Sequence, residues 1–119
     1  MKKDNVFEIT TRLEEGGIMI LKIAGYVDAS NINHFEQQLG EQINKGYYKI
    51  ILDCSELEYL NSSALGIILD FHKLAAKHQG GIRLLNLSHR IESTFNMLGF
   101  NDYFLIFSEE KKAIESFNK

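Results

Sequence analysis

One apolar run limits the fold more than any other part of the sequence. The segment Ile50–Asp53 begins with three aliphatic residues and shows no alternation with polar ones. A strand with one face in water alternates, so this run predicts a strand covered on both faces, as in the middle of a parallel sheet. We interpret Cys54–Leu60 as a loop and expect a helix from about Ser62 to His78.

Three polar residues, Asn61, Ser62 and Ser63, stand at the expected start of that helix. Their short side chains can accept hydrogen bonds from the first free backbone N–H groups. Two hydroxyls are therefore expected where unpaired N–H groups and the positive end of the helix dipole point outward. Such a place accommodates negative charge, so a phosphorylated hydroxyl would be a charge switch on a rigid element. The plain alternative is a helix cap and nothing more.

The other elements follow from apolar spacing and turn signals. A turn at Glu14–Gly17 joins the first two strands in a hairpin. We expect Asp28 or Ser30 to cap the first helix, Ser88 the third and Ser108 the last. In order, the predicted elements are strands over Val6–Arg12 and Ile18–Ala24, a helix through Ile32, Phe35, Leu39 and Ile43, the strand and helix described above, a strand over Ile82–Leu87, a helix through Ile91, Phe95 and Leu98, a strand over Phe104–Phe107, and a last helix through Ala113, Ile114 and Phe117.

This order, β-β-α-β-α-β-α-β-α, predicts a single α/β domain over residues 1–119. Strands that alternate with helices form a mainly parallel sheet with right-handed crossovers, and the opening hairpin adds an antiparallel pair. We therefore expect a mixed sheet of about five strands packed against about four helices. In the second strand, Met19, Leu21 and Ile23 share the face that should point to the core.

Composition limits the partners and the cellular location. The net charge of −3, from 13 basic and 16 acidic residues, provides no broad positive surface for nucleic acid or an anionic membrane. No apolar run approaches the roughly 20 residues that span a bilayer, and the first residues lack the apolar core of a signal peptide. The single cysteine, Cys54, fits a reducing compartment. We expect a cytoplasmic protein without nucleic-acid binding or membrane insertion.

No pattern for metal, cofactor or hydrolytic chemistry is present in the sequence. The histidines lack ligand spacing, and no glycine-rich phosphate loop follows a strand, so no metal and no cofactor are expected. A serine hydrolase acting through Ser62 or Ser63 would need an exposed nucleophile and a base. The segment Asn61–Gly66 does not match the Gly-x-Ser-x-Gly elbow of such enzymes. No catalytic residue is predicted.

Four parts of the chain together resemble the STAS domains, and within them the bacterial anti-sigma factor antagonists. Gly25–Asp28 is similar to the glycine-to-aspartate step before the first helix of that family, and Ile51–Ser55 to its central strand and the turn after it. Tyr59–Gly66 resembles its phosphorylation segment, normally Asp-Ser-Ser-Gly-Leu-Gly or Asp-Ser-Thr-Gly-Leu-Gly. Leu98–Phe100 followed by Phe104–Phe107 resembles its C-terminal part.

The resemblance implies a partner-switching regulator of sigma-factor-dependent transcription that is not an enzyme. In that family the unmodified antagonist binds an anti-sigma factor that is also a serine kinase, and so frees a sigma factor. The kinase phosphorylates the first serine of the pair, which ends the complex, and a serine phosphatase restores the free hydroxyl. Carried over by position, the acceptor of the phosphate is Ser62.

This chain departs from the family pattern at two positions of the segment. Asn61 replaces an aspartate and keeps capping ability without the charge, and Ala64 replaces a glycine and favours helix by up to about 1 kcal/mol. Strand ends and the helix starts that follow them share one edge of a parallel sheet, so we expect the partner surface there. Its predicted residues are Asp28, Ala29, Ser30, Asn61, Ser62, Ser63, Ala64, Leu65 and Ile67.

Several alternatives stay open at this point. Ile67, Phe71 and Leu74 fit either a helix buried widely between the sheet and a neighbouring helix or an exposed apolar strip beside Ser62. The chain can also be a STAS subunit of another assembly, such as a stressosome-like scaffold or a membrane lipid-transport complex. A small hydrolase is the third hypothesis.

Overall fold

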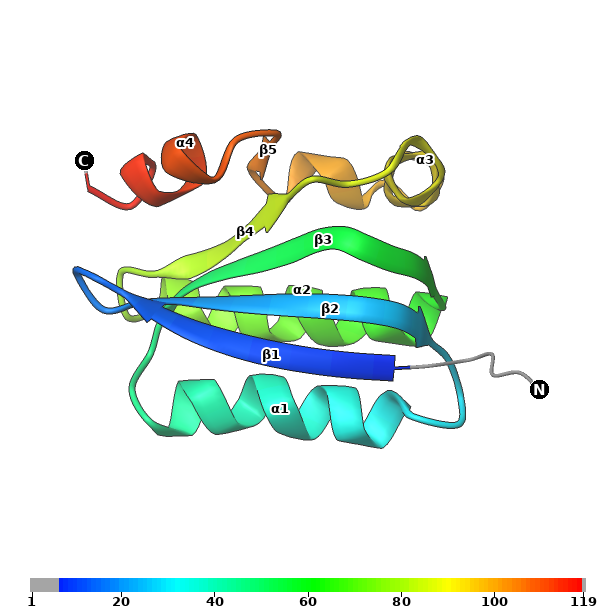
Figure 1. Cartoon of the computed structure of the whole chain (residues 1–119), viewed down its shortest axis with the longest axis horizontal. Coiled ribbons are helices and arrows are strands. Elements are labelled where there is room, and N and C mark those ends of the chain that lie inside the picture. Colours follow the sequence, from blue (N-terminus) through cyan, green and yellow to red (C-terminus); the bar gives the residue numbers. More distant parts are fainter. Residues whose placement is uncertain (1–6, 119) are drawn as a thin grey trace.

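The predicted order of elements is confirmed by the structure, a computed structural model that describes residues 7–118 (Figure 1). Val6, the predicted first residue of the first strand, lies outside the described residues. The elements are β1 (Phe7–Glu14), β2 (Ile18–Val27), α1 (Ile32–Asn44), β3 (Lys49–Leu60), α2 (Ser62–Ala76), β4 (Gly81–Leu85), α3 (His89–Met97), the 3-10 helix η1 (Phe100–Asp102), β5 (Ile106–Phe107) and α4 (Glu110–Glu115).

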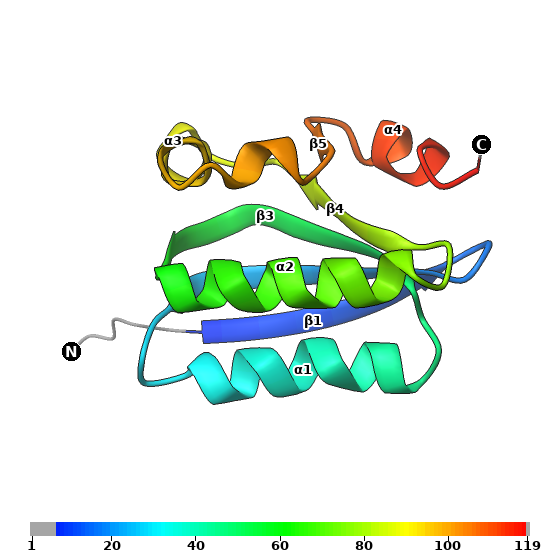
Figure 2. The same ribbon diagram turned by 180° about the vertical axis from the view of Figure 1, so that it is seen from behind.

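The five strands form one mixed sheet in the order β1-β2-β3-β4-β5. β1 and β2 are antiparallel, and β2 to β5 run parallel to one another. Each parallel connection passes through a helix, the usual form of the crossover that parallel strands need. Figure 2 looks onto α1 and α2, which lie side by side against one face of the sheet.

Apolar side chains fill both faces of the central strands. The main core lies under α1, α2 and α3, where Leu21 and Leu52 are fully buried. A smaller core on the opposite face joins Ile20 and Ile51 to Ala113 and Phe117 at the C-terminal helix. Because neighbouring residues of a strand point to opposite faces, the unbroken apolar run in β3 is the expected signature of this double burial.

The segment Cys54–Leu60 is a continuation of β3 and not the loop that we predicted. Two shifts in the pairing of β2 with β3 each place one extra residue in β3, between Asp53 and Glu56 and again between Leu57 and Tyr59. At the first of these bulges, the carboxylate of Asp53 accepts the N–H of Ser55 at 3.0 Å. Bulges interrupt the two-residue period of a strand, and that interruption made the sequence resemble a loop.

Two predicted helix caps are also wrong. α1 begins after Asn31 without a side-chain cap, and α4 begins after Glu109 instead of Ser108. Ser88 does cap α3, since its Oγ accepts the N–H of Ile91 at 3.1 Å. The last predicted strand shortens to Ile106–Phe107.

His72 of α2 completes the sheet where β5 is too short. The N–H groups of Ile82 and Leu84 leave β4 on the same side, because the two residues are two apart in a strand. Leu84 donates to the carbonyl of Leu105 at 3.0 Å. Ile82 donates instead to Nδ1 of His72 at 2.9 Å, and the imidazole packs on Phe104 with ring centroids 5.0 Å apart. The ring must be neutral to accept this bond.

This contact predicts an acid-sensitive contribution to stability. Burial, and then the charge of Arg83, lower the pKa of His72, whereas an unfolded chain titrates near 6.5. The unfolded state therefore binds more protons between these values, so the contribution is complete above about pH 6.5 and is lost as the pH falls through the folded pKa. His72→Gln offers an acceptor that does not titrate, so its free energy of unfolding should decrease less between about pH 7 and 5.

Urea unfolding at several pH values measures the free energy of unfolding of the wild type and of His72→Gln as a function of pH. The other histidines and the carboxylates are common to both chains, so the difference in slope reports His72. Equal slopes would contradict the assignment.

Candidate functional site

The candidate site lies where β2 and β3 end, at one edge of the sheet. Val27 and Leu60 are the last paired residues of these strands. Immediately beyond them, the N–H of Asn61 donates to the carbonyl of Val27 at 3.1 Å. The turn that begins at Asp28 and the helix that begins at Ser62 are therefore held side by side, as the sequence predicted.

The turn after β2 is held by its own polar side chains. Oδ1 of Asp28 accepts the N–H of Ser30 at 3.0 Å and its hydroxyl at 2.6 Å. Asn31, which sequence reasoning did not single out, accepts the N–H of Asp28 at 3.0 Å and donates to the carbonyl of Tyr26 at 2.8 Å. Ala29 and Ser30 are exposed at the tip. Neither Asp28 nor Ser30 caps α1, because their polar atoms are used within the turn.

The start of α2 has the predicted cap and two exposed hydroxyls. Oδ1 of Asn61 accepts the N–H of Ala64 at 2.9 Å. Ser62 and Ser63 are exposed, and within residues 7–118 their backbone N–H groups have no protein acceptor. These N–H groups and the dipole of a 15-residue helix make this position favourable for an anion.

The structure corrects the predicted partner surface at two residues. Ala64 and Leu65 are fully buried, because they belong to the stripe of α2 that faces the sheet. Their side chains support the helix start from beneath and cannot meet a partner in this conformation. Ile67 is half-buried and packs on the main core, so only part of it can contribute. The accessible remainder consists of Asp28, Ala29, Ser30, Asn61, Ser62 and Ser63.

The apolar side of α2 beyond this point is mainly a helix-packing surface. Phe71 lies against α1, where its Cζ would be 3.3 Å from a Cβ placed on Gly40. Because Gly40 has no side chain, α1 and α2 can pack closely at this point. Leu74 alone is exposed, at 39%. Burial between helices therefore explains Ile67 and Phe71 better than an exposed docking strip does.

The chemistry available at this edge is that of exposed hydroxyls. Among the described residues, no histidine is hydrogen-bonded to Ser62 or Ser63, and no group of three His, Cys, Asp or Glu could hold a metal ion. Cys54 is buried in β3, and burial raises the pKa of its thiol to about 12. No helix within residues 7–118 is both long and apolar enough to cross a membrane.

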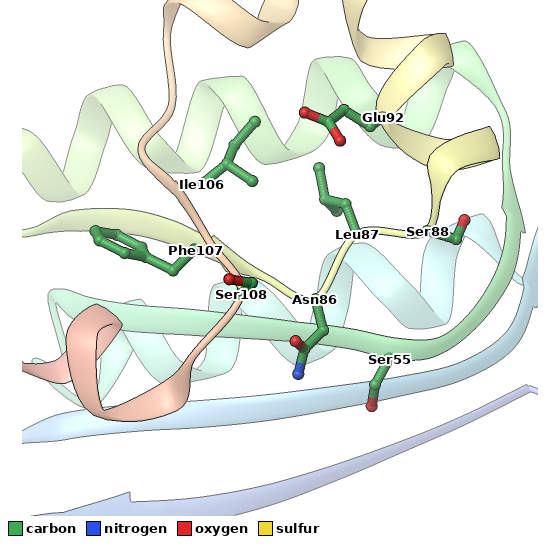
Figure 3. A pocket seen from close by; sticks show the side chains of 8 residues that line it. All are labelled: Ser55, Asn86, Leu87, Ser88, Glu92, Ile106, Phe107 and Ser108. Carbon is green, nitrogen blue, oxygen red and sulfur yellow. The ribbon is translucent and has the colours of Figure 1, made fainter.

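A separate hollow of about 550 Å³ lies between the ends of β4 and β5 and the start of α3. Figure 3 shows that its side chains diverge. Glu92, Leu87 and Ile106 extend to one side of the β4–α3 connection, and Asn86 and Ser55 extend to the other. Since these groups do not converge on one point, the hollow is not the candidate site.

Comparisons with known proteins agree with this geometry. A family model described as the STAS domain matches residues 11–113. BtrV of Bordetella bronchiseptica, a candidate anti-sigma factor antagonist, is 28% identical over 101 residues, which cover 85% of this chain and 87% of BtrV.

Two solved structures share the fold. An anti-sigma factor antagonist from Mycobacterium paratuberculosis superposes with a TM-score of 0.87 at 15% identity, over 100% of both chains. The Bacillus cell fate determinant SpoIIAA in its phosphorylated form superposes with a TM-score of 0.71 at 19% identity, over 92% of this chain and 98% of that one. At these identities the likeness establishes the fold alone.

The cap at Asn61 allows a direct test of how the helix start is held. Asn61→Ala removes the oxygen that accepts the Ala64 N–H and should lower the free energy of unfolding by about 0.5–2 kcal/mol. Asn61→Asp keeps an acceptor and adds a negative charge at the positive end of the helix, so it should equal the wild type or exceed it by about 0.3–1 kcal/mol. Urea denaturation measures both. An Asn61→Ala chain as stable as the wild type would show that the cap contributes nothing.

Proposed function

Since the chain belongs to the STAS domain family, we propose that it is an anti-sigma factor antagonist switched by phosphorylation at Ser62. Unmodified, it binds an anti-sigma factor with serine kinase activity and so frees a sigma factor. Phosphorylation ends the complex, and a serine phosphatase reverses the modification. In this proposal the protein is a cytoplasmic regulator of transcription and has no catalytic residue of its own.

One observation carries the proposal: an exposed serine at the unpaired start of a long, well-supported helix. The hydroxyl of Ser62 is accessible, whereas the two residues that follow Ser63 are fully buried and fix the helix to the sheet. A kinase has to align an acceptor hydroxyl with the terminal phosphate of its nucleotide, so a rigid acceptor assists transfer. BtrV and the family model support the antagonist role, and SpoIIAA provides a phosphorylated protein of the same fold.

The phosphate is expected to act locally. A phosphoserine adds about −1.5 to −2 charges near neutral pH. Beside the free N–H groups of Ser62 and Ser63, this charge gains about 0.3–1 kcal/mol if it stays exposed, so the domain should tolerate it. Neutral Asn61 adds no repulsion, unlike the aspartate usual in the family. The domain therefore has no reason to refold on modification.

The partner is expected to reject the phosphate. A docked kinase surface would have to strip water from the new charge, which is costly unless the charge is paired. Immediately after transfer, the phosphate also stands next to the remaining phosphates of the nucleotide, and like charges repel. A loss of only about 2.7 kcal/mol weakens binding a hundredfold.

One observation favours the alternative of a STAS subunit in a larger assembly. Met97, Leu98, Tyr103 and Leu105 are exposed apolar side chains around η1, and Met97 reaches 82% exposure. Leu98 shares one apolar stripe with Ile91 and Phe95 in the predicted helix, yet it is exposed, whereas the other two are buried. These exposed apolar residues are near one another in the sequence and are typical of a protein contact surface, one that is separate from the Ser62 site. Recovery of the protein from native cytoplasm in a large complex would favour this alternative, whereas recovery with a kinase-like anti-sigma factor would favour the antagonist.

The acceptor can be assigned by exchanging each serine in turn. Incubation with ATP and the anti-sigma factor kinase should modify the wild type and Ser63→Ala to the same extent, and leave Ser62→Ala unmodified. Phosphate mapping by mass spectrometry measures this. Modification that persists in Ser62→Ala would refute the assignment.

The switch itself is tested with charge variants. Ser62→Ala should bind the anti-sigma factor as the wild type does, whereas Ser62→Asp, with less charge than a phosphate, should bind about 10-fold to 100-fold more weakly. All three chains should have similar melting temperatures. If Ser62→Asp melts far below the wild type, the loss of binding is a folding defect and the local mechanism is wrong.

A further inference from the structure

Two tyrosines at the same edge of the sheet belong to neither core. Tyr26 and Tyr59 are paired residues of β2 and β3, with ring centroids 6.4 Å apart and ring planes tilted by 35°. Val27 and Leu60, which follow them, point into the main core. The tyrosines therefore lie on the opposite face, and among the described residues neither is packed against a hydrophobic cluster. Tyr59 is 44% exposed.

Within residues 7–118, no helix packs against the tyrosine pair in either hydrophobic cluster. α4 packs over Ile20 and Ile51, nearer the starts of β2 and β3. In Figure 1 α4 is at the upper left, whereas β2 and β3 end at the right. Burial in the fold thus gives no reason for aromatic side chains at this place, and an exposed tyrosine beside a half-buried one is typical of the contact residues of protein interfaces.

The tyrosine pair is continuous with the Ser62 site. The carbonyl of Tyr26 accepts the Asn31 side chain at 2.8 Å, within the turn that forms half of the site. Tyr59 stands three residues before Ser62, and the hydrogen bond from Asn61 to Val27 lies between them. A partner that covers Ser62 therefore needs to extend only around the end of the two strands to reach the rings.

The charges around the pair are mainly negative. Glu56 and Glu58 are exposed on β3 next to Tyr59, and Asp28 follows Tyr26 by two residues. The basic residue on this part of β2, Lys22, is paired with Glu56 at 3.0 Å. Aromatic faces beside carboxylates bind arginine or lysine well, because the cation stacks on the ring and pairs with the carboxylate.

We propose that Tyr26 and Tyr59 form an aromatic docking pair that receives an arginine or lysine side chain of the kinase partner. The inference rests on the proposed function, because it assigns the partner that also approaches Ser62. The pair supplies affinity and takes no part in phosphoryl transfer. Ser62 changes the charge of the interface, while the tyrosine pair adds affinity to the complex that the unmodified chain forms.

The experiment uses the full chain and the anti-sigma factor kinase that binds Ser62→Ala. Tyr59→Ala should weaken binding at least tenfold, whereas Tyr59→Phe, which keeps the ring face, should stay within about threefold of the wild type. Tyr103→Ala is the matched control, because Tyr103 is an exposed tyrosine away from the edge, on the residue after η1, at 53%. It should leave the affinity unchanged. In phosphorylation assays Tyr59→Ala should raise KM and keep kcat.

A charge reversal provides a second measurement that does not depend on the aromatic ring. Glu58→Lys is a substitution at an exposed position, so the fold should tolerate it, and it should weaken binding most at low salt. If thermal melting shows that Tyr59→Ala is unstable, the affinity of Glu58→Lys for the kinase tests the proposal instead.

The outcomes separate this inference from the proposed function. If Ser62→Asp loses binding while Tyr59→Ala and Glu58→Lys bind as the wild type does, the docking pair is wrong and the antagonist role stands. Equal losses in Tyr59→Ala and Tyr103→Ala would also overturn the pair. If no anti-sigma factor binds the wild type, both proposals fail.

Discussion

A single backbone hydrogen bond, from Asn61 to the carbonyl of Val27, joins the two segments that make the site. It forms where β2 and β3 stop pairing, so it continues the sheet by one step into the loops. Its acceptor, the carbonyl of Val27, directly precedes the turn that Asp28 and Ser30 hold with hydrogen bonds of their own. Its donor is Asn61, the residue that caps α2. The packing of Ala64 and Leu65 then fixes to the sheet the helix that presents the two exposed serines.

The two bulges of β3 determine what lies at the end of the sheet. Without the first, Leu57 would point away from the main core, because a shift by one residue exchanges the two faces of a strand. The second shift restores the original alternation, so Leu60 also points into the main core, and the two extra residues together place Tyr59 opposite Tyr26. The bulges are therefore a condition for the docking pair, and they also allow the strand to carry exposed glutamates close to the site.

The sequence was sufficient for the fold class, but not for the surface of the candidate site. Element order and the apolar run at Ile50–Asp53 gave the sheet topology, because periodicity and burial are directly linked. The bulged half of β3 was missed, since two irregular pairings destroy the alternation that identifies a strand. Leu65 was expected at the surface because sequence alone does not fix the rotation of a helix about its axis. Leu98 was placed on one helical stripe with Ile91 and Phe95, but α3 ends at Met97 and Leu98 is 45% exposed.

The contact between His72 and β4 has a consequence for association between copies of the chain. An uncovered strand edge displays free N–H groups that can recruit a strand of another molecule, and proteins protect such edges in various ways. β5 shields β4 only at Leu84 and Leu85. At Ile82 the imidazole occupies the exposed donor, and Phe104 packs behind the ring. A helix side chain thus closes the margin of the sheet against edge-to-edge aggregation, a task that a longer β5 would otherwise perform.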